Sequence, residues 1–515
     1  MDYHHEALDY RNKYILAPMV RIGVLPFRLE CLKYGADLVY SEEIIDRRIS
    51  ETVRRENSDF PGLIEYIHVK DKALTWSTCE AEKGKVVLQL GTASAVGALK
   101  AAMTVARDVA AIDINMGCPK GFSTNAGMGA ALLKTPEISS DILKTLRRNL
   151  PCPVTCKIRL LEPDLPFEKT RDYLRMCEQS GAVAIGVHAR LKEDRPRVRA
   201  RWPVWALLKD SISVPLIANG DFFSSSDVGA FLSCHAGSVD SIMVARGAMW
   251  DPSVFWKMKR DHPLTPGGGP PVGPVRTEPS RTDVWGDVVR RCVECNNPFQ
   301  ATKFTMQKMT EEAGMTQEFK ERLTQTRNTE DICDIFEVGD WYRGARREQT
   351  VPFPPHAHTL NYYKKLQDDW PGLVRRQMEE REALLEETEK GREENPARGD
   401  DVREGGQKRR GGFTDEEEKK EADSLFAAQK TAECSSMKDV CPHQGEAPNP
   451  VPVASSSSSG SFSSTGSDSS PPVVRKRPKI NSSQEEDQGD GEAGKQVAQF
   501  TEDGMEDEKA EGKAR

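Results

Sequence analysis

The sequence predicts a parallel (β/α)8 barrel, that is, a TIM barrel, followed by a small all-α domain and a disordered tail. Short apolar runs alternate with helix-like segments from residue 14 to about residue 250, a rhythm typical of βα units. Polar residues collect at the ends of those runs. After residue 390 the composition changes to Glu, Lys, Ser, Gly and Pro. An open, doubly wound sheet is the alternative fold.

The eight predicted strands are, in order, YILAPMV, LVYSEEI, VVLQLG, AIDINMGC, VTCKIRL, AIGVHAR, PLIANGD and SIMVARGA. These runs are almost continuously apolar, as expected for parallel strands that are covered by helices outside and by packed side chains inside. The segments between them have helical character, for example at residues 93–108, 167–180 and 204–209.

Chemically active side chains follow the predicted strands. They are Met19, Glu42, Gln89, Cys118, Lys157, His188, Asn219, Asp221 and Arg246. Because the carboxyl ends of barrel strands share one face, and this face carries the active site of such enzymes, we expect these residues to meet. Every strand is followed by polar residues, so one such residue is weak evidence for a functional site. The whole set together indicates an active site.

Residues 111–133 form the most informative stretch, an apolar strand that breaks into a Gly-rich loop holding Cys118. The loop glycines allow positive φ or a close approach to a ligand, and we expect them to give clearance for a substrate. An inert buried thiol is the ordinary fate of a cysteine. The place of Cys118 at the barrel mouth favours a proton donor instead.

The remaining strand-end groups suit an anionic, planar, heteroaromatic cofactor. We expect its phosphate near the last two strands, where Gly220, Gly247 and Arg246 offer backbone amides and a positive charge. Lys157 and Gln89 then face the ring. A flavin gathers negative charge at its pyrimidine edge on reduction, and a lysine complements that charge.

Composition limits the function classes. The formal net charge of -8 argues against a protein that coats nucleic acid by bulk charge. No apolar run approaches the roughly 18 residues of a membrane span, and the N-terminus has no signal-peptide pattern, so we expect a cytoplasmic protein. The twelve cysteines are scattered and should be mostly reduced. Cys292 and Cys295 form a CxxC without a matching second pair, and we expect helix positions rather than a metal site.

Composition shifts predict five segments: a catalytic barrel at 1–262, a Gly/Pro-rich insert at 263–282, a helical domain at 283–345, a charged helical extension at 346–390 and a low-complexity tail at 391–515. The tail contains a basic cluster from Arg475 to Lys479, which is either a nuclear-import signal or a weak RNA contact. Its other residues are candidates for binding further proteins.

Several motifs together resemble the tRNA-dihydrouridine synthase family, most of all its eukaryotic type 2 branch. They are APMV, INMGCPKGFSTNAGMGAALL, VTCKIRL, VHAR, IANGD and MVARGA, and the likeness spans about residues 10–260, with a weaker extension to about 340. The resemblance implies an FMN-bearing barrel that uses NADPH, or NADH, to reduce the C5–C6 double bond of a uridine in the tRNA D-loop, at position 20. It also implies that the helical domain holds the tRNA. The sequence implies no oligomer, so we expect a monomer.

By position, the resemblance gives Cys118 the role of proton donor. It places the FMN contacts on Pro18, Met19, Val20, Gln89, Lys157, His188, Asn219, Gly220, Asp221, Ala245 and Arg246. Two features depart from the family pattern. Ala189 stands where a glycine is usual after the histidine, and no α-β-β-β-α pattern of a double-stranded-RNA-binding domain follows residue 355.

A stacked uridine has to be turned out to meet a flavin, which costs a few kcal/mol that contacts to the RNA must supply. Cationic residues suited to phosphate cluster after the sixth strand, unless they form only a solvated loop; they are Arg190, Lys192, Arg195, Arg197, Arg199 and Arg201. Two other functions stay open: a barrel flavoprotein that reduces a small pyrimidine or enone, and a non-enzymatic protein that keeps the fold to bind RNA or protein.

Overall fold

The computed structural model describes residues 8–58, 60–265, 275, 277–348, 372, 374–379 and 383. Eight parallel strands close into a barrel in the order β1-β11-β10-β9-β8-β7-β6-β2. They are β1 (Tyr14–Leu16), β2 (Leu38–Ile45), β6 (Val86–Gly91), β7 (Ala111–Met116), β8 (Val154–Leu160), β9 (Ile185–Leu191), β10 (Leu216–Asn219) and β11 (Ser241–Val244). The predicted barrel is confirmed, and closure between β1 and β11 excludes the open sheet.

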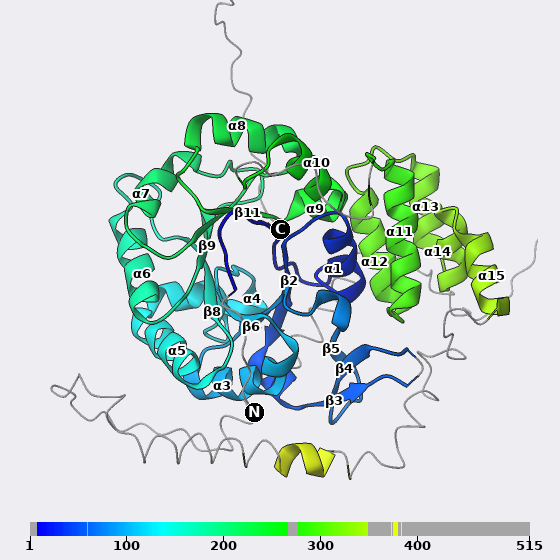
Figure 1. Ribbon diagram of the computed structural model, residues 1–515, viewed down its shortest axis with the longest axis horizontal. Coiled ribbons are helices and arrows are strands. Elements are labelled where there is room, and N and C mark those ends of the chain that lie inside the picture. The colour runs from blue at the N-terminus through cyan, green and yellow to red at the C-terminus, as the bar shows by residue number, and fades with distance from the viewer. Residues whose placement is uncertain are drawn as a thin grey trace, which may run out of the picture. The chain divides into compact units, whose positions relative to one another are not determined.

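Helices surround the barrel, as Figure 1 shows. They include α1 (Leu25–Lys33), α3 (Ala95–Val105), α5 (Pro136–Asn149), α6 (Glu168–Gln179), α7 (Trp205–Lys209), α8 (Ser225–His235), α9 (Arg246–Trp250) and α10 (Val254–Asp261). Each helix buries an apolar stripe against the strands, as α5 does with Ile142, Leu143 and Leu146. At the start of α8, Ser224 and Asp227 cap each other's backbone N–H groups.

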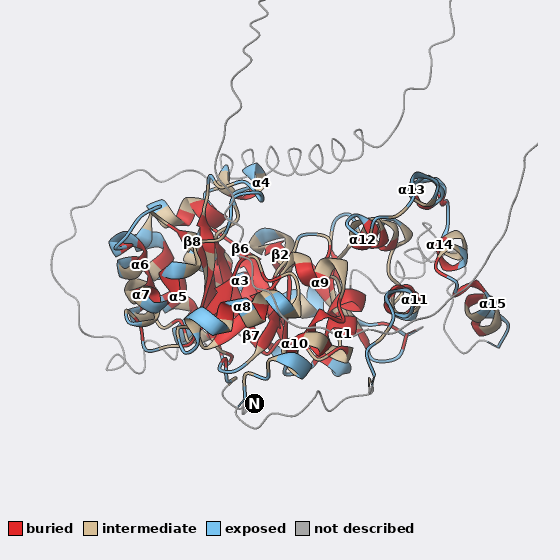
Figure 2. Ribbon diagram, turned by 90° about the horizontal axis from the view of Figure 1, so that it is seen from above, coloured by how far each residue is buried: buried red, intermediate tan, exposed pale blue. Residues whose placement is uncertain are grey.

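Adjacent strand residues belong to different cores because side chains alternate across a strand. In β1, Ile15 packs with the barrel interior, whereas Tyr14 and Leu16 pack with the helices. The interior cluster also holds Tyr40 and Met243. Figure 2 shows the strands almost wholly buried. The barrel is therefore a filled core, and a ligand site is expected only at its mouth.

A small antiparallel sheet, absent from the sequence prediction, interrupts the barrel between β2 and β6. It contains β3 (Thr52–Glu56), β4 (Leu63–His68) and β5 (Leu74–Cys79) in that order and follows the short helix α2 (Asp46–Ser50). The prediction missed it because TVRRE is too charged to read as a strand. Its stability comes from tertiary contacts, such as the Arg54 to Asp108 ion pair at 2.7 Å.

A helical region follows the barrel, as the sequence predicted, and over residues 281–348 it contains α11 (Arg281–Glu294), α12 (Phe299–Thr310), α13 (Gln317–Gln325), α14 (Thr329–Ile335) and α15 (Gly339–Glu348). Helix α11 packs against α1 through two ion pairs, Lys33 to Asp287 at 2.5 Å and Arg291 to Glu30 at 2.9 Å. Within the residues described, no cluster of His, Cys, Asp or Glu is arranged to hold a metal ion. Cys292 is buried in α11, and Cys295 is its C-cap residue.

The charged extension is described only in part. Residues 374–379 are helical, Val374 packs on Val53 and Ile67, and the Gln377 amide donates to the Arg54 carbonyl and accepts from the Arg54 N–H. The rest of the extension, much of the Gly/Pro-rich insert and the tail with its basic cluster lie outside the described residues. None of the described helices is long and apolar enough to cross a membrane.

Candidate active site

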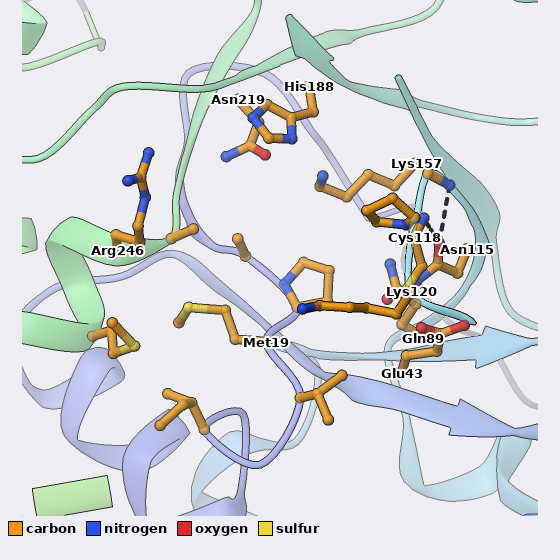
Figure 3. Close-up of a pocket in the computed structure, with 18 of the residues that line it drawn as sticks. Met19, Glu43, Gln89, Asn115, Cys118, Lys120, Lys157, His188, Asn219 and Arg246 are labelled. Carbon is orange, nitrogen blue, oxygen red and sulfur yellow. Dashed lines mark hydrogen bonds between the residues drawn. The ribbon is translucent and has the colours of Figure 1, made fainter. Parts of the chain in front are cut away.

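A cavity of about 520 Å³ opens at the barrel mouth. This volume lies in the range of small-molecule and cofactor sites. Of the predicted site residues it gathers Cys118, Pro18, Met19, Val20, Gln89, Lys157, His188, Asn219, Ala245 and Arg246. Figure 3 shows those of them that it labels, among them Cys118, Lys157 and Arg246, around a common space.

Gly220 and Asp221 are predicted site residues that do not line this cavity. The Asp221 carboxylate accepts hydrogen bonds from Arg190 and from the Ala200 N–H at 2.6 Å, and it lies 3.4 Å from Arg246. Gly220 has φ +129°, and a Cβ there would lie 2.8 Å from the Ala200 Cβ. Gly220 and Asp221 therefore contact both the loop after β9, through Ala200, and Arg246.

A hydrogen-bond chain fixes the Cys118 loop. Asn115 Oδ1 accepts the N–H groups of Gly117 and Cys118 at 3.0 and 2.9 Å. Asn115 Nδ2 donates to Gln89 Oε1 at 2.9 Å, and Gln89 Nε2 donates to the buried Asp113 carboxylate at 2.8 Å. The orientation of both amides is thus set from inside the barrel, and the thiol is positioned by groups on two strands.

Two glycines of the Cys118 loop, Gly117 and Gly129, pack closely against other parts of the protein. Gly129 has φ +58°, and a Cβ on it would lie 2.8 Å from the Cys118 carbonyl oxygen and 3.0 Å from the Cys118 Cβ. Gly117 packs against β8, where an added Cβ would lie 3.3 Å from the Ile158 carbonyl carbon. At Gly129 glycine allows the loop to pack on the protein itself rather than on a substrate, whereas Gly117 lines the cavity, so clearance for a substrate stays a prediction there.

The Cys118 thiol is protonated at neutral pH. Burial, followed by the negative charge of Glu43, raises its pKa to about 12. A thiolate nucleophile is disfavoured in such an environment, whereas a neutral S–H group can donate a proton.

The opposite wall of the cavity is cationic. Lys157 forms no ion pair or hydrogen bond with any residue the structure describes, and burial, together with nearby Arg159, lowers its pKa to about 8. Arg159 donates to the Gly117 carbonyl at 2.9 Å. Arg246 completes this wall and packs over the Phe223 ring at 4.7 Å. The wall is suited to an anion.

His188 is neutral in this setting. Burial and the positive charges of Lys157, Arg159, Arg190 and Arg246 keep its pKa well below the usual value. Its Nε2 atom lies 3.0 Å from Nη1 of Arg190. Because arginine only donates, Nε2 accepts this hydrogen bond, and the ring proton is on Nδ1.

Sequence reasoning missed several lining residues: Glu43, Asn115, Lys120, Arg159, Phe304 and Lys308 from α12, and Glu311, the C-cap residue of α12. It chose Glu42 at the end of the second strand, but Glu42 accepts the Arg21 N–H at 2.6 Å and does not line the cavity. Asn115 lies two residues before Gly117, and Arg159 lies two residues after Lys157. Because side chains two positions apart in a strand point to the same side, this alternation could have identified both residues. No local signal pointed to α12.

A second cavity, of about 450 Å³, shares Lys120, Arg159, His188 and Arg246 with the first. It borders the cationic loop after β9. Arg190, expected on that loop, is instead buried in β9 and paired with Asp221, while Arg201 pairs with Asp194. Arg195, Arg197 and Arg199 are exposed, so these three remain suited to phosphate contacts.

The dihydrouridine synthase (Dus) family model matches residues 15–331. The tRNA-dihydrouridine(20) synthase of Schizosaccharomyces pombe, an NAD(P)+ type, is 33% identical over 341 residues, which is 64% of this chain and 66% of that protein. Its Saccharomyces cerevisiae counterpart is 37% identical over 262 residues, 48% of this chain and 67% of that protein. The chain thus spans about two thirds of the length of these relatives. The family model covers more than half of the chain, which therefore belongs to the dihydrouridine synthase family of oxidoreductases.

Proposed function

We propose that the chain reduces the C5–C6 double bond of a uridine in the tRNA D-loop, at position 20, with FMN as cofactor and NADPH or NADH as reductant. One observation carries the proposal: the protonated Cys118 thiol and a cationic wall border the same cavity. Reduction of this double bond needs a hydride at one carbon and a proton at its neighbour, so an acid and a site for an anionic redox cofactor must be adjacent. The names of the two yeast relatives support position 20.

The residues present fit FMN. The Lys157 ammonium is buried and unpaired among the described residues, so it is available to a ring that gains negative charge. Arg246 is about one third exposed and lies on the side of the last two strands, where a phosphate binds in barrels of this kind. FMN, when bound, supplies the hydride. Its proposed contacts are Pro18, Met19, Val20, Gln89, Lys157, His188, Asn219, Gly220, Asp221, Ala245 and Arg246.

The protein's own groups supply the remaining chemistry. The S–H bond of Cys118 breaks, and the proton goes to C5 of the uracil ring. The neutral His188 offers its Nδ1–H as a donor to a carbonyl oxygen. Phe304 and Lys308 of α12 narrow the cavity from the side of the helical region, which reduces access for water.

For the tRNA, residues 1–262 would supply catalysis and residues 283–345 would bind the RNA. Arg195, Arg197 and Arg199 are exposed, and Arg195 lines the second cavity, so their charges can meet phosphates and offset the cost of unstacking the uridine. A free pyrimidine or small enone needs no such loop. We infer that the enzyme acts as a monomer in the cytoplasm.

Purified protein tests the proposal directly. We expect flavin absorbance that survives gel filtration, and dihydrouridine in tRNA from a dihydrouridine-free strain after addition of NADPH. Liquid chromatography with mass spectrometry measures the product, and free uridine at the same concentration is the control. Protein that stays colourless after addition of FMN contradicts the proposal, whereas equal turnover of free uridine favours the small-molecule reductase.

A further inference from the structure

Glu43 is the one buried carboxyl group on the Cys118 side of the cavity among the described residues that line it. It lies in β2, is 9% exposed, and appears with Cys118 on the same wall in Figure 3. The two side chains interact, because Glu43 contributes to the raised pKa of the thiol. Strands β2 and β7 thus bring together two acidic groups that are far apart in sequence.

The Glu43 carboxylate is only partly satisfied. Its Oε1 atom accepts the Ser123 hydroxyl at 2.8 Å, whereas Oε2 is buried and accepts no hydrogen bond from an N–H or O–H group within the described part of the chain, which leaves the Cys118 thiol as the other donor that faces the carboxylate. Such an arrangement is costly, since an unpaired buried carboxylate oxygen loses its hydration without compensation. Two glycines leave room for the carboxylate and its partner: a Cβ on Gly91 would lie 2.7 Å from Oε1, and one on Gly129 would lie 2.4 Å from the Ser123 hydroxyl.

We propose that Glu43 is a positioning residue for the Cys118 acid: its carboxylate keeps the sulfur protonated in the resting site and passes a proton back to the sulfur after each transfer. This inference rests on the proposed function, in which Cys118 donates to the substrate. It explains why a buried carboxylate with only one oxygen bonded to a hydroxyl lies beside the thiol.

The proton balance closes over one cycle. The Cys118 S–H bond breaks, a C–H bond forms at C5, and a thiolate is left beside the Glu43 carboxylate. Two adjacent negative charges in a buried site repel each other, so the pair gains affinity for one proton. The carboxylate takes up one proton from the bulk solvent, relayed by water that enters the emptied cavity, and transfers it to the sulfur, so that each cycle consumes one solvent proton and leaves no hydroxide. Thiol and carboxylate are then restored.

Other charged groups near the pair act in the opposite direction or are held elsewhere. Lys157 and Arg159 lie close enough to favour a thiolate, but the guanidinium of Arg159 is engaged by the carbonyls of Gly117 and Leu191. Ser123, from α4 (Gly121–Thr124), contributes only a hydroxyl. Removal of the Glu43 charge should therefore lower the pKa of the Cys118 thiol.

The first test needs no cofactor or substrate. Glu43→Gln keeps the shape and removes the charge, so the Cys118 thiolate fraction rises by tenfold for each unit by which the thiol pKa falls. We expect iodoacetamide at pH 9 to alkylate Cys118 at least about fivefold faster than in the wild type, as measured by quantitative peptide mass spectrometry. Asp46→Asn is the matched control, because Asp46 is also mostly buried after β2 but does not line the cavity.

An unchanged Cys118 rate in Glu43→Gln would overturn the proposal. A parallel acceleration at the buried Cys156 and Cys177 would do so too, since it would report an opened barrel rather than a changed thiol. Glu43→Asp retains the charge and should restore slow alkylation.

The second test separates the two roles of Glu43. In Glu43→Gln, the first turnover of flavin-reduced enzyme with tRNA should stay within about threefold of wild type, while kcat falls about 10²-fold because the thiol is reprotonated slowly. Equal losses in both rates indicate a merely structural role and contradict the relay. If wild-type protein makes no dihydrouridine, the proposed function fails, whereas the alkylation result still reports on the Glu43–Cys118 contact.

Discussion

The two walls of the cavity differ in charge and in the way their key groups are held. On the β2/β7 wall, Cys118 and Glu43 are buried, and both have raised pKa values because the charged forms lose water. On the β8–β11 wall, Lys157 forms no ion pair within the described residues, and the pKa values of both Lys157 and Arg246 are lowered by burial and by neighbouring arginines, although Arg246 lies 3.4 Å from Asp221. In the proposed function, the first wall delivers a proton and the second binds an anionic cofactor. Closing the strands into a barrel places both around one ligand space.

Removing the acid from the β2/β7 wall should have the largest effect. We expect Cys118→Ala to reduce dihydrouridine formation by about 10² to 10⁴-fold, the usual contribution of a general acid, with FMN affinity unchanged. Single-turnover assays with reduced enzyme measure the loss. Unaltered turnover in this variant would remove Cys118 as the proton donor.

Removing the charge from the opposite wall should affect cofactor binding instead. Lys157→Met deletes a charged hydrogen-bond donor, which typically contributes about 1.5 to 3 kcal/mol, so we expect FMN affinity to fall by about 10 to 100-fold. Quenching of FMN fluorescence measures it, and Lys120→Met, on the Cys118 side, is the control. Similar losses in both variants would contradict the division between the walls.

Loosening the Cys118 loop should give a smaller effect that also reaches stability. Asn115→Ala removes the acceptor of two loop N–H groups and the donor to Gln89. Unsatisfied buried groups cost about 1 to 3 kcal/mol, so the free energy of unfolding should fall by that amount and turnover by about tenfold. Urea unfolding and steady-state assays provide the measurements. Full activity with reduced stability would show that the network supports the fold alone.

The pH dependence of FMN binding should show the smallest effect. Burial lowers the pKa of Lys157 to about 8, so the ammonium is present below pH 8 and is lost as the pH rises through it. Wild-type FMN affinity should therefore decline between pH 7 and pH 9, by several-fold, because the charge that attracts the anion disappears. Lys157→Met should lack this decline. A matching decline in the variant would assign the titration to another group.

Most of the barrel was predictable because its eight strands are separate apolar runs with helices between them. The antiparallel sheet was not, since TVRRE gains its strand structure from β4 and from the Arg54–Asp108 ion pair. The site shows the same division. The sequence analysis named Cys118, Lys157 and His188, which end or follow apolar runs, and all three line the cavity. It named Glu42 instead of its neighbour Glu43, because the pairing register of a strand decides which side chain near its end points into the cavity.

The sequence by itself determined the order of the strands, the helical region after them and the motifs that indicate the family, because hydrophobic periodicity and strand-end chemistry are local properties. Only the tertiary structure decided which groups meet. Burial and proximity, which no single segment encodes, make Cys118 a neutral acid, put Glu43 beside it, and turn Arg190 from an expected phosphate contact into the partner of Asp221. Protonation and pairing depend on neighbours from distant strands, and closure of the barrel supplies those neighbours.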